Sequence, residues 1–202
     1  MTFLQHYLPG QAQEQNGQSS AGIQTSYQID ANDRTIWIGA DLEWADMWVK
    51  EFQANSLGTP DNVRFQGQHY DFDVQSQQYS LFANGEWQAA EKLTLEAGLR
   101  YESLTYDYQN NMIDGSTRDG GSLCNSSTGS CRYFRPSDRS DTSDDVNYQI
   151  GAHYELAAST GAFFRLASAY RAPQINELYR LQKEQEIAEV TPEPVSYTHL
   201  RA

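Results

Sequence analysis

The sequence predicts an all-β fold in which antiparallel, up-and-down strands form part of a transmembrane β-barrel. Three observations lead to this fold class. Apolar and polar residues alternate along several segments, as they do along strands with two different faces. The connections between these segments are alternately short and long, so the short ones share one end of the sheet. Aromatic residues stand near the ends of the apolar stretches, where barrel strands carry aromatic girdles.

Residues 93–109 show the alternation most clearly. Leu95 and Leu99 fall on one side of such a strand, and Glu96 and Arg100 fall on the other. The apolar face can pack on a second sheet in a soluble protein or contact lipid in a membrane barrel. A soluble sandwich has no reason to keep its long loops at one end, so the loop pattern favours lipid.

Six strands are predicted, and they span residues 22–30, 34–52, 69–88, 93–109, 145–156 and 162–172. The first two are joined by a tight turn, and each carries apolar residues at alternate positions. Asp46 interrupts the apolar face of the second strand. The part of this strand that crosses the membrane is therefore expected to lie before Asp46.

The third strand changes phase along its length. Tyr70 and Phe72 occupy even positions, whereas Tyr79 and Leu81 occupy odd ones. A β-bulge near residues 75–78 would reconcile the two halves. Alternatively, one half of the strand lies outside the apolar layer of the membrane.

Short turns and one long insertion define the remaining strands. Residues 89–92 form the turn into the fourth strand, and residues 157–161 join the last two. The insertion at 110–144 is rich in Gly, Ser, Asn and Asp and fits no regular element. Pro173 ends the sixth strand because proline cannot donate to a β-ladder. The expected girdle residues are Trp44, Trp48, Tyr101, Tyr106 and Tyr108 at the loop end and Trp87 at the turn end.

Charge and hydropathy exclude two classes of protein. The formal net charge is −13 at pH 7, which argues against a nucleic-acid partner because phosphate binding needs a basic face. Mean hydropathy is −0.71, and no apolar run is long enough for a transmembrane helix. A membrane barrel is still compatible with these values, because only half of each barrel strand is apolar.

No motif for catalysis or for a cofactor is present. The sequence lacks a nucleophile elbow, a paired-histidine metal motif and a phosphate loop. We therefore predict that the chain is not an enzyme and has no catalytic residue, cofactor site or metal site. The acidic run at 137–145 is interpreted as a solvated loop, with Ca²⁺ binding as the alternative because hard cations prefer carboxylates. Asp71 and Asp73 are interpreted in the same way, as solvated residues with Ca²⁺ binding as the alternative.

Cys124 and Cys131 flank a short stretch rich in Ser, Gly and Asn. A zinc site normally needs four ligands, and the nearest histidine, His153, stands alone. We expect a disulfide that closes a small loop in an oxidising compartment and adds about 2–3 kcal/mol of constraint. Two free thiols in the loop are the alternative.

Three segments resemble TonB-dependent outer-membrane receptors. The sequence ASAYRAPQINELY at 167–179 resembles the YRAP…NELY stretch of that family, where a barrel strand ends and an extracellular loop begins. YSLFANGEWQAAEKLTLEAGLRYE at 79–102 resembles the two preceding strands and their turn. VTPEP at 190–194 resembles the lead into the following strand. The resemblance covers most of the chain between residues 20 and 193.

The resemblance implies a barrel of about 22 strands in the bacterial outer membrane, plugged by an N-terminal globular domain. Such receptors take up ferric siderophores, cobalamin or similar scarce ligands, with energy from the TonB inner-membrane complex acting through the plug. Because the plug and most strands are missing here, residues 1–195 are expected to be a slice of the barrel wall. Residues 196–202, SYTHLRA, resemble a translated sequencing-adapter read and are expected to be non-native.

The charged residues expected to face the lumen are Glu96, Arg100, Glu102, Arg165 and Arg171. They either pair the wall with the plug or line the path of the ligand. A slice of wall also has two unpaired strand edges, and lipid does not tolerate unpaired backbone groups. We therefore expect the isolated chain to be insoluble.

Other functions stay open from the sequence. A different outer-membrane barrel, such as a porin or an adhesin, would lack an upstream plug. A soluble β-domain that binds carbohydrate would express without detergent. An outer-membrane barrel enzyme would show hydrolase activity in the complete gene product.

Overall fold

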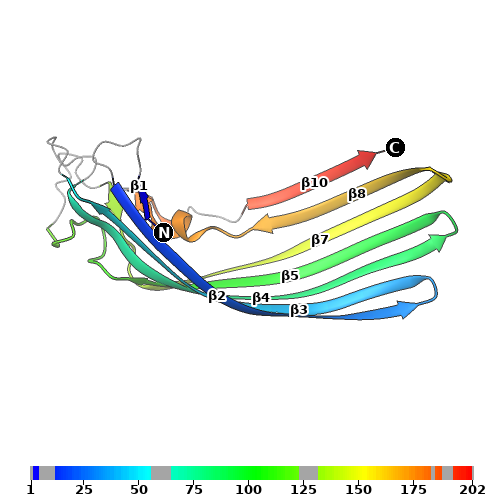
Figure 1. Cartoon of the computed structure of the whole chain (residues 1–202), viewed down its shortest axis with the longest axis horizontal. Coiled ribbons are helices and arrows are strands. Elements are labelled where there is room, and N and C mark those ends of the chain that lie inside the picture. Colours follow the sequence, from blue (N-terminus) through cyan, green and yellow to red (C-terminus); the bar gives the residue numbers. More distant parts are fainter. Residues whose placement is uncertain are drawn as a thin grey trace.

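A computed structural model describes residues 2–4, 12–55, 65–122, 132–182, 185–187 and 193–201. Within these residues the main sheet has eight antiparallel strands, in the order β1 (Thr2–Leu4), β2 (Ala12–Ala31), β3 (Arg34–Gln53), β4 (Gly67–Ala90), β5 (Leu93–Asn110), β7 (Arg139–Ala157), β8 (Thr160–Arg171) and β10 (Glu193–Arg201). The other described elements are the paired strands β6 (Tyr133–Phe134) and β9 (Leu181–Gln182) and the helix α1 (Ile175–Tyr179). The prediction of an all-β, antiparallel, up-and-down fold is confirmed (Figure 1). No described helix is long and apolar enough to cross a membrane.

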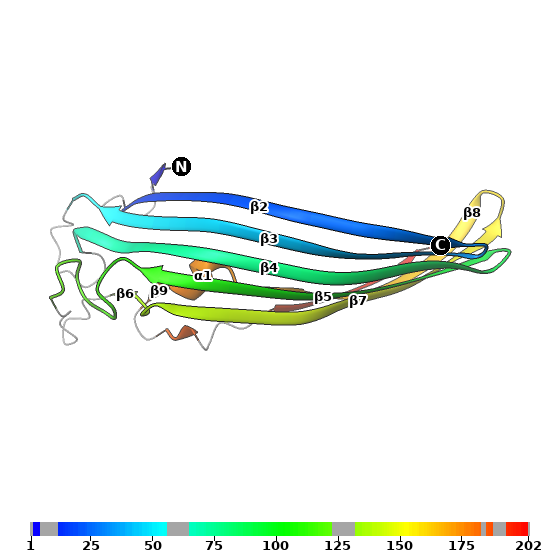
Figure 2. The ribbon, with the colours of Figure 1, turned by 90° about the horizontal axis from the view of Figure 1, so that it is seen from below.

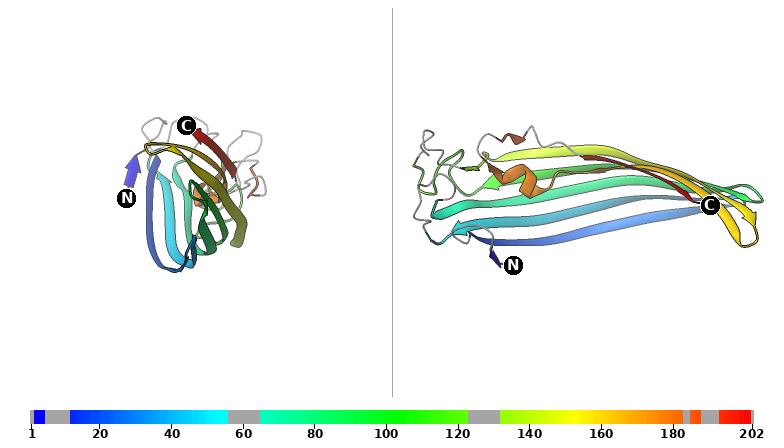
Figure 3. Two further views of the ribbon diagram at one scale, coloured as in Figure 1. Left: turned by 90° about the vertical axis from the view of Figure 1, so that its right-hand side faces the viewer. Right: turned by 90° about the horizontal axis from the view of Figure 1, so that it is seen from above.

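The main sheet is an open arc. Figures 1 and 2 show its strands side by side in chain order, with tight turns at one end and longer connections at the other. Seen along the strands in Figure 3, the sheet curves around a side that contains α1, and the described strands do not close into a barrel. We call the face on the side of α1 the inner face and the opposite face the outer face. The two ends are called the turn end and the loop end.

Several strands extend beyond the ranges expected from the sequence. β2 begins at Ala12 rather than at residue 22, and β7 begins at Arg139 rather than at residue 145. The additional residues are mostly polar, yet they pair one by one with the neighbouring strands. Ladder hydrogen bonds join backbone groups and need no apolar side chains. Hydrophobic alternation therefore detects the membrane half of these strands and misses the part beyond it.

The phase change in β4 occurs without a bulge. The register between β4 and β5 is regular from Phe72 to Gln88, so the bulge considered near residues 75–78 is absent. Tyr70 and Phe72 point to the inner face and are buried, whereas Tyr79 points to the outer face and is exposed. The apolar side chains change face along one regular strand, as the second interpretation requires.

Near the turn end, the outer face carries a belt of exposed apolar side chains. On β4 the stretch from Tyr79 to Trp87 has the length of about 9–11 residues that a tilted strand needs to cross the hydrocarbon layer. The large exposed residues of this belt are Ile23, Tyr27, Ile29, Ile36, Ile38, Leu42, Trp44, Tyr79, Leu81, Trp87, Leu99, Val146, Tyr148, Ile150, Tyr154, Leu156 and Phe164. In a membrane barrel, lipid covers such a belt.

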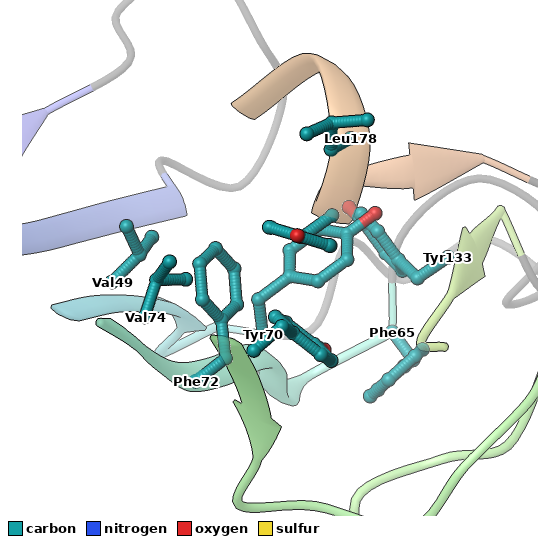
Figure 4. Close-up of a cluster of buried hydrophobic side chains, with 9 residues drawn as sticks. Val49, Phe65, Tyr70, Phe72, Val74, Tyr133 and Leu178 are labelled. Atoms are coloured by element: carbon teal, nitrogen blue, oxygen red, sulfur yellow. The ribbon is translucent and has the colours of Figure 1, made fainter. Parts of the chain in front are cut away.

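Beyond the belt, apolar side chains are buried on the inner face instead. The buried cluster contains Val49, Phe65, Tyr70, Phe72, Val74, Tyr108, Tyr133, Leu178 and Tyr179 (Figure 4). In this part, apolar surface is removed from water on the side of α1 and the β6–β9 pair. Along β3, residues 45–53 carry the wall about 30 Å past the belt.

Two residues of the expected girdle lie on the other face. Tyr106 and Tyr108 occupy even positions on β5, so they point inward, opposite to Tyr101. Tyr108 stacks on Tyr179, with ring centroids 4.3 Å apart. Their assignment to the girdle was wrong, because a regular strand cannot present odd and even positions to the same face. Trp44 lies on the outer face, as the girdle requires.

Residues 193–201 form β10, which pairs with β8 from Arg171 to Phe163. Without β10, this side of β8 would be an edge with unpaired backbone groups, and such an edge pairs with extended segments of many sequences. The ladder at 196–201 therefore needs no hydrophobic alternation. The non-native origin expected for residues 196–202 stays a prediction.

Candidate functional site

The register places all the expected lumen-facing residues on the inner face: Glu96, Arg100, Glu102, Arg165 and Arg171. Arg100 on β5 donates from Nη1 to Asp41 Oδ2 on β3 (2.7 Å) and from Nε to Glu102 Oε2 (3.1 Å). Ser80, on the intervening β4, donates to the same Asp41 oxygen at 3.1 Å. These bonds connect three neighbouring strands through charged side chains.

A second ion pair spans one strand. Arg165 on β8 donates to Glu96 Oε1 on β5, with Nη2 at 2.8 Å and Nε at 2.9 Å. β7 lies between the two strands, and Gly151 is the β7 residue at this position. A Cβ atom at Gly151 would lie 2.2 Å from Glu96 Oε1. Glycine therefore leaves the space through which the two side chains meet.

Arg171 binds the helix rather than another strand. Its guanidinium donates to both carboxylate oxygens of Glu177, at 3.1 and 3.0 Å. The Gln174 N–H also donates to Glu177 (2.8 Å), which forms part of a capping box at the start of α1. These hydrogen bonds, first of all those from Arg171, hold the pKa of Glu177 below its usual value. Arg171 thus joins the end of β8 to α1.

Sequence reasoning missed a buried ion network at the loop end. Arg180, just after α1, donates to Glu14 Oε2 on β2 (2.8 Å) and to Glu51 on β3. Glu51 Oε1 lies 2.9 Å from His69 Nδ1, and His69 Nε2 lies 2.7 Å from the Phe65 carbonyl oxygen. Burial lowers the pKa of Arg180, but the two glutamates outweigh it and raise the pKa above its usual value. The network ties the segment after β8 to strands far away in the sequence.

Arg135 is a buried cation that joins loop segments. Only 1% of the residue is exposed, and burial lowers the pKa of its guanidinium. It donates to the carbonyl oxygens of Ile113 (2.9 Å), His69 (3.1 Å) and Thr117, and to the Thr117 hydroxyl (2.6 Å). A guanidinium with several fixed donors can satisfy this many acceptors at once. No spacing in the sequence marks this arginine, because three of its four acceptors are backbone carbonyls that any residue carries.

Two tyrosines hold the segment after β8 against the wall. The Tyr70 hydroxyl donates to the Leu181 carbonyl oxygen at 2.5 Å, and the Tyr179 hydroxyl donates to Asp141 Oδ2 at 2.9 Å. Burial raises the pKa of both phenols, so they remain protonated donors at physiological pH. The YRAP…NELY stretch therefore folds inward at the loop end.

The acidic run at 137–145 belongs mostly to β7 and is not a loop. In a strand, successive carboxylates alternate between two faces, so they do not converge on one cation. Among the described residues, no group of His, Cys, Asp and Glu side chains is arranged to hold a metal ion. Asp71 and Asp73 both accept from Asn111 Nδ2, at 3.2 and 2.6 Å, and are engaged in that way.

A comparison with known protein families identifies the family to which this chain belongs. The sequence model described as TonB dependent receptor-like, beta-barrel matches residues 2–196. The chain belongs to this family. TonB-dependent receptors reside in the bacterial outer membrane, and they are transporters rather than enzymes. No curated protein sequence matches the chain.

Solved structures of TonB-dependent receptors have the same fold. The copper transporter OprC gives a TM-score of 0.65 at 14% identity, over 95% of this chain and 28% of that chain. The open form of the ferric-catecholate import receptor Fiu from E. coli K12 gives 0.53 at 13% identity, over 81% and 26%. The ferric yersiniabactin uptake receptor FyuA from Yersinia pestis gives 0.55 at 11% identity, over 93% and 25%. This TonB-dependent receptor chain thus spans about a quarter of the length of each of these proteins.

Proposed function

We propose that the chain is part of the wall of an outer-membrane importer that takes up a scarce ligand, such as a ferric siderophore. In this proposal, extracellular loops and a plug bind the ligand, and the TonB inner-membrane complex acts on the plug to release it inward. The observation that carries the proposal is the change of apolar face along single strands. This change fits a barrel wall whose outer face contacts lipid in the half near the turn end and water in the half near the loop end.

The charged inner face supports a role for the wall against a plug. The side chains of Arg165 and Glu96 are paired yet remain partly exposed, at 50% and 36%. Such groups can form further hydrogen bonds to a domain placed inside the arc. We propose that Glu96, Arg100, Glu102 and Arg165 face the lumen. Arg171 instead anchors α1 through its bonds to Glu177.

The similar structures support a metal-bearing ligand. Two of them are named as receptors for ferric ligands and one as a copper transporter. At sequence identities of 11–14%, this similarity concerns the fold and does not identify the ligand. We therefore propose a ferric siderophore as the ligand class and test copper beside it.

Cys124 and Cys131 lie outside the described residues. We propose that they form the disulfide expected from their spacing, because the loops of an outer-membrane protein meet an oxidising medium. A thiol-reactive label that modifies both cysteines only after reduction would support the disulfide, and labelling without reduction would reject it.

An uptake assay tests the transport function. The receptor gene that contains this chain is expressed in bacteria that lack their own siderophore receptors. Uptake of radiolabelled iron is measured with a ferric catecholate and with ferric yersiniabactin, and copper uptake is measured separately. Uptake that disappears when TonB is deleted supports the proposal. Uptake that persists without TonB indicates a porin, and a lack of uptake of every metal rejects the ligand class.

A further inference from the structure

The residues that the structure describes leave a free edge along the loop-end part of β7. β7 pairs with β5 from Arg139 to Tyr154, but it pairs with β8 only from Tyr148 onward. Within the part of the chain that the structure describes, no backbone hydrogen bond reaches the β8 side of residues 139–147. Among the described residues, this edge therefore presents backbone donors and acceptors that lack a neighbouring strand.

Side chains stop the β7–β8 ladder at this point. By continuation of the register, the next hydrogen-bonded pair of this ladder would join Val146 to Tyr170. Instead, the Val146 N–H donates to the Asp145 carboxylate (2.6 Å), and the Tyr170 N–H donates to the Asn147 side chain (2.8 Å). The chain after β8 then turns inward to α1, so β8 does not return to the edge.

The direction of the free N–H groups follows from one bond near the turn end. The Glu155 N–H donates to the Lys92 carbonyl oxygen on the β5 side (2.9 Å). Alternate residues of an antiparallel strand direct their backbone groups to opposite neighbours. Odd residues of β7 therefore bond to β5. Even residues of this part of β7 face the free edge: Ser140, Thr142 and Asp144 direct both N–H and C=O groups to it, whereas the Val146 N–H already donates to Asp145.

The free edge forms one wall of a cavity of about 700 Å³. Consecutive residues 141–144 line this cavity, so the edge of the strand contributes to the wall together with side chains of both faces. Tyr106, Phe134 and Leu178 add apolar and aromatic surface. The cavity thus combines a row of backbone groups with apolar contacts.

The lining is also negatively charged. Asp141, Asp144 and Glu186 contribute carboxylates, and Arg139 contributes the guanidinium that binds Asp141. A positively charged occupant is therefore favoured electrostatically.

We propose that this edge binds an extended, cationic peptide segment supplied by another molecule, which adds a strand beside β7. A row of backbone donors and acceptors at strand spacing is complementary to another extended backbone. Lysine side chains of that peptide meet the carboxylates, and its apolar side chains contact the aromatic residues. The site lies on the wall of the proposed importer, but its test needs no uptake, so either proposal can fail without the other.

A binding assay with a synthetic peptide tests the site. The purified receptor that contains this chain is titrated, in detergent, into a fluorescent peptide of alternating Lys and Val, about eight residues long. Methylation of the amide nitrogens at one set of alternate residues should weaken binding at least about tenfold, because those amides face β7. Methylation of the other set should leave the affinity unchanged. Equal affinities for both methylated peptides, or no binding of the parent peptide, would overturn the proposal.

Two variants of one residue give a matched control. Thr142→Pro removes an edge N–H, whereas Thr142→Val keeps that N–H and removes only the hydroxyl that contacts Thr105 (2.9 Å). Proline is tolerated on an edge whose N–H has no ladder partner. We expect about tenfold weaker peptide binding for Thr142→Pro and unchanged binding for Thr142→Val. Equal binding by the two variants contradicts the strand addition. The methylated peptides, used with the unmodified receptor, decide the question if the proline variant does not fold.

Discussion

Gly151 controls whether Glu96 on β5 and Arg165 on β8 can form their ion pair. The Glu96 carboxylate occupies the space that a Cβ atom at Gly151 would need. Gly151→Ala should displace Glu96 and break the pair. The loss should stay below about 1 kcal/mol because both side chains are partly exposed. Urea unfolding of the receptor in detergent measures the change.

A double-mutant comparison identifies the cause of that loss. In a Glu96→Ala background the ion pair and the side chain that fills this space are both gone, so Gly151→Ala should cost little more. Gly85→Ala is the control, because its Cβ would meet no atom nearer than 3.9 Å. An equal cost of Gly151→Ala in both backgrounds would show that the glycine acts on the backbone alone.

Arg135 should be far more sensitive than a surface arginine. Arg135→Met leaves the buried carbonyl oxygens of His69 and Thr117 without their donor, and each buried unsatisfied group costs about 1–3 kcal/mol. Arg34→Met, at an exposed position on the turn end, should change stability by less than about 0.5 kcal/mol. Hydrogen exchange of the backbone amides at 65–70 and 113–117 measures the local loss of stability. Unchanged protection of both segments in Arg135→Met would contradict the joining role.

β4 offers a test of where the membrane ends. Leu81 and Gln75 lie on the same outer face of this strand, the first inside the apolar belt and the second beyond it. Leu81→Arg should destabilise the barrel by about 2–4 kcal/mol in a bilayer, whereas Gln75→Arg should cost less than about 1 kcal/mol. Unfolding of the receptor in phospholipid vesicles measures both. Similar costs for the two substitutions would place the membrane boundary elsewhere.

The docking of α1 should depend on pH in the acidic range. The pKa of Glu177 is lowered in the folded protein, mainly by Arg171, so its stabilising effect is present above the unfolded-state value of 4.5. This stabilisation is lost as pH falls below 4.5 and through the folded pKa. The protection of the Leu178 amide, corrected for intrinsic exchange, should therefore fall in this range. Glu177→Gln should lower protection at neutral pH and remove the dependence.

The open arc predicts how the chain behaves as a whole. In the described part of the chain, the end strands β1 and β10 have one neighbour each, so backbone groups on their outer edges are available for pairing with other chains. Because the apolar belt is also exposed, the 202-residue chain alone should form insoluble material. Size-exclusion chromatography without detergent checks this. A soluble monomer with a cooperative thermal transition would contradict it.

Much of the membrane half could be predicted from local patterns. The alternation around Leu95 and Glu96 identifies a strand with a lipid-facing and an inward-facing side, because the pleat alone separates neighbouring residues. The girdle prediction was wrong for Tyr108 because it assigned both odd and even residues of β5 to the outer face, which the pleat does not allow. The loop half was harder, because the polar residues 139–144 carry no apolar alternation and their strand is defined by pairing with β5.

By itself, the sequence determined the all-β class, the alternation of two faces along the strands and the resemblance to TonB-dependent receptors. These properties depend on residues close together in the chain and on the solvent that each face meets. Only the tertiary structure decided that Arg180 reaches Glu14, that Arg135 joins two loop segments and that part of β7 has no second neighbour among the described strands. Such contacts depend on register and curvature, which bring together residues that no local pattern connects.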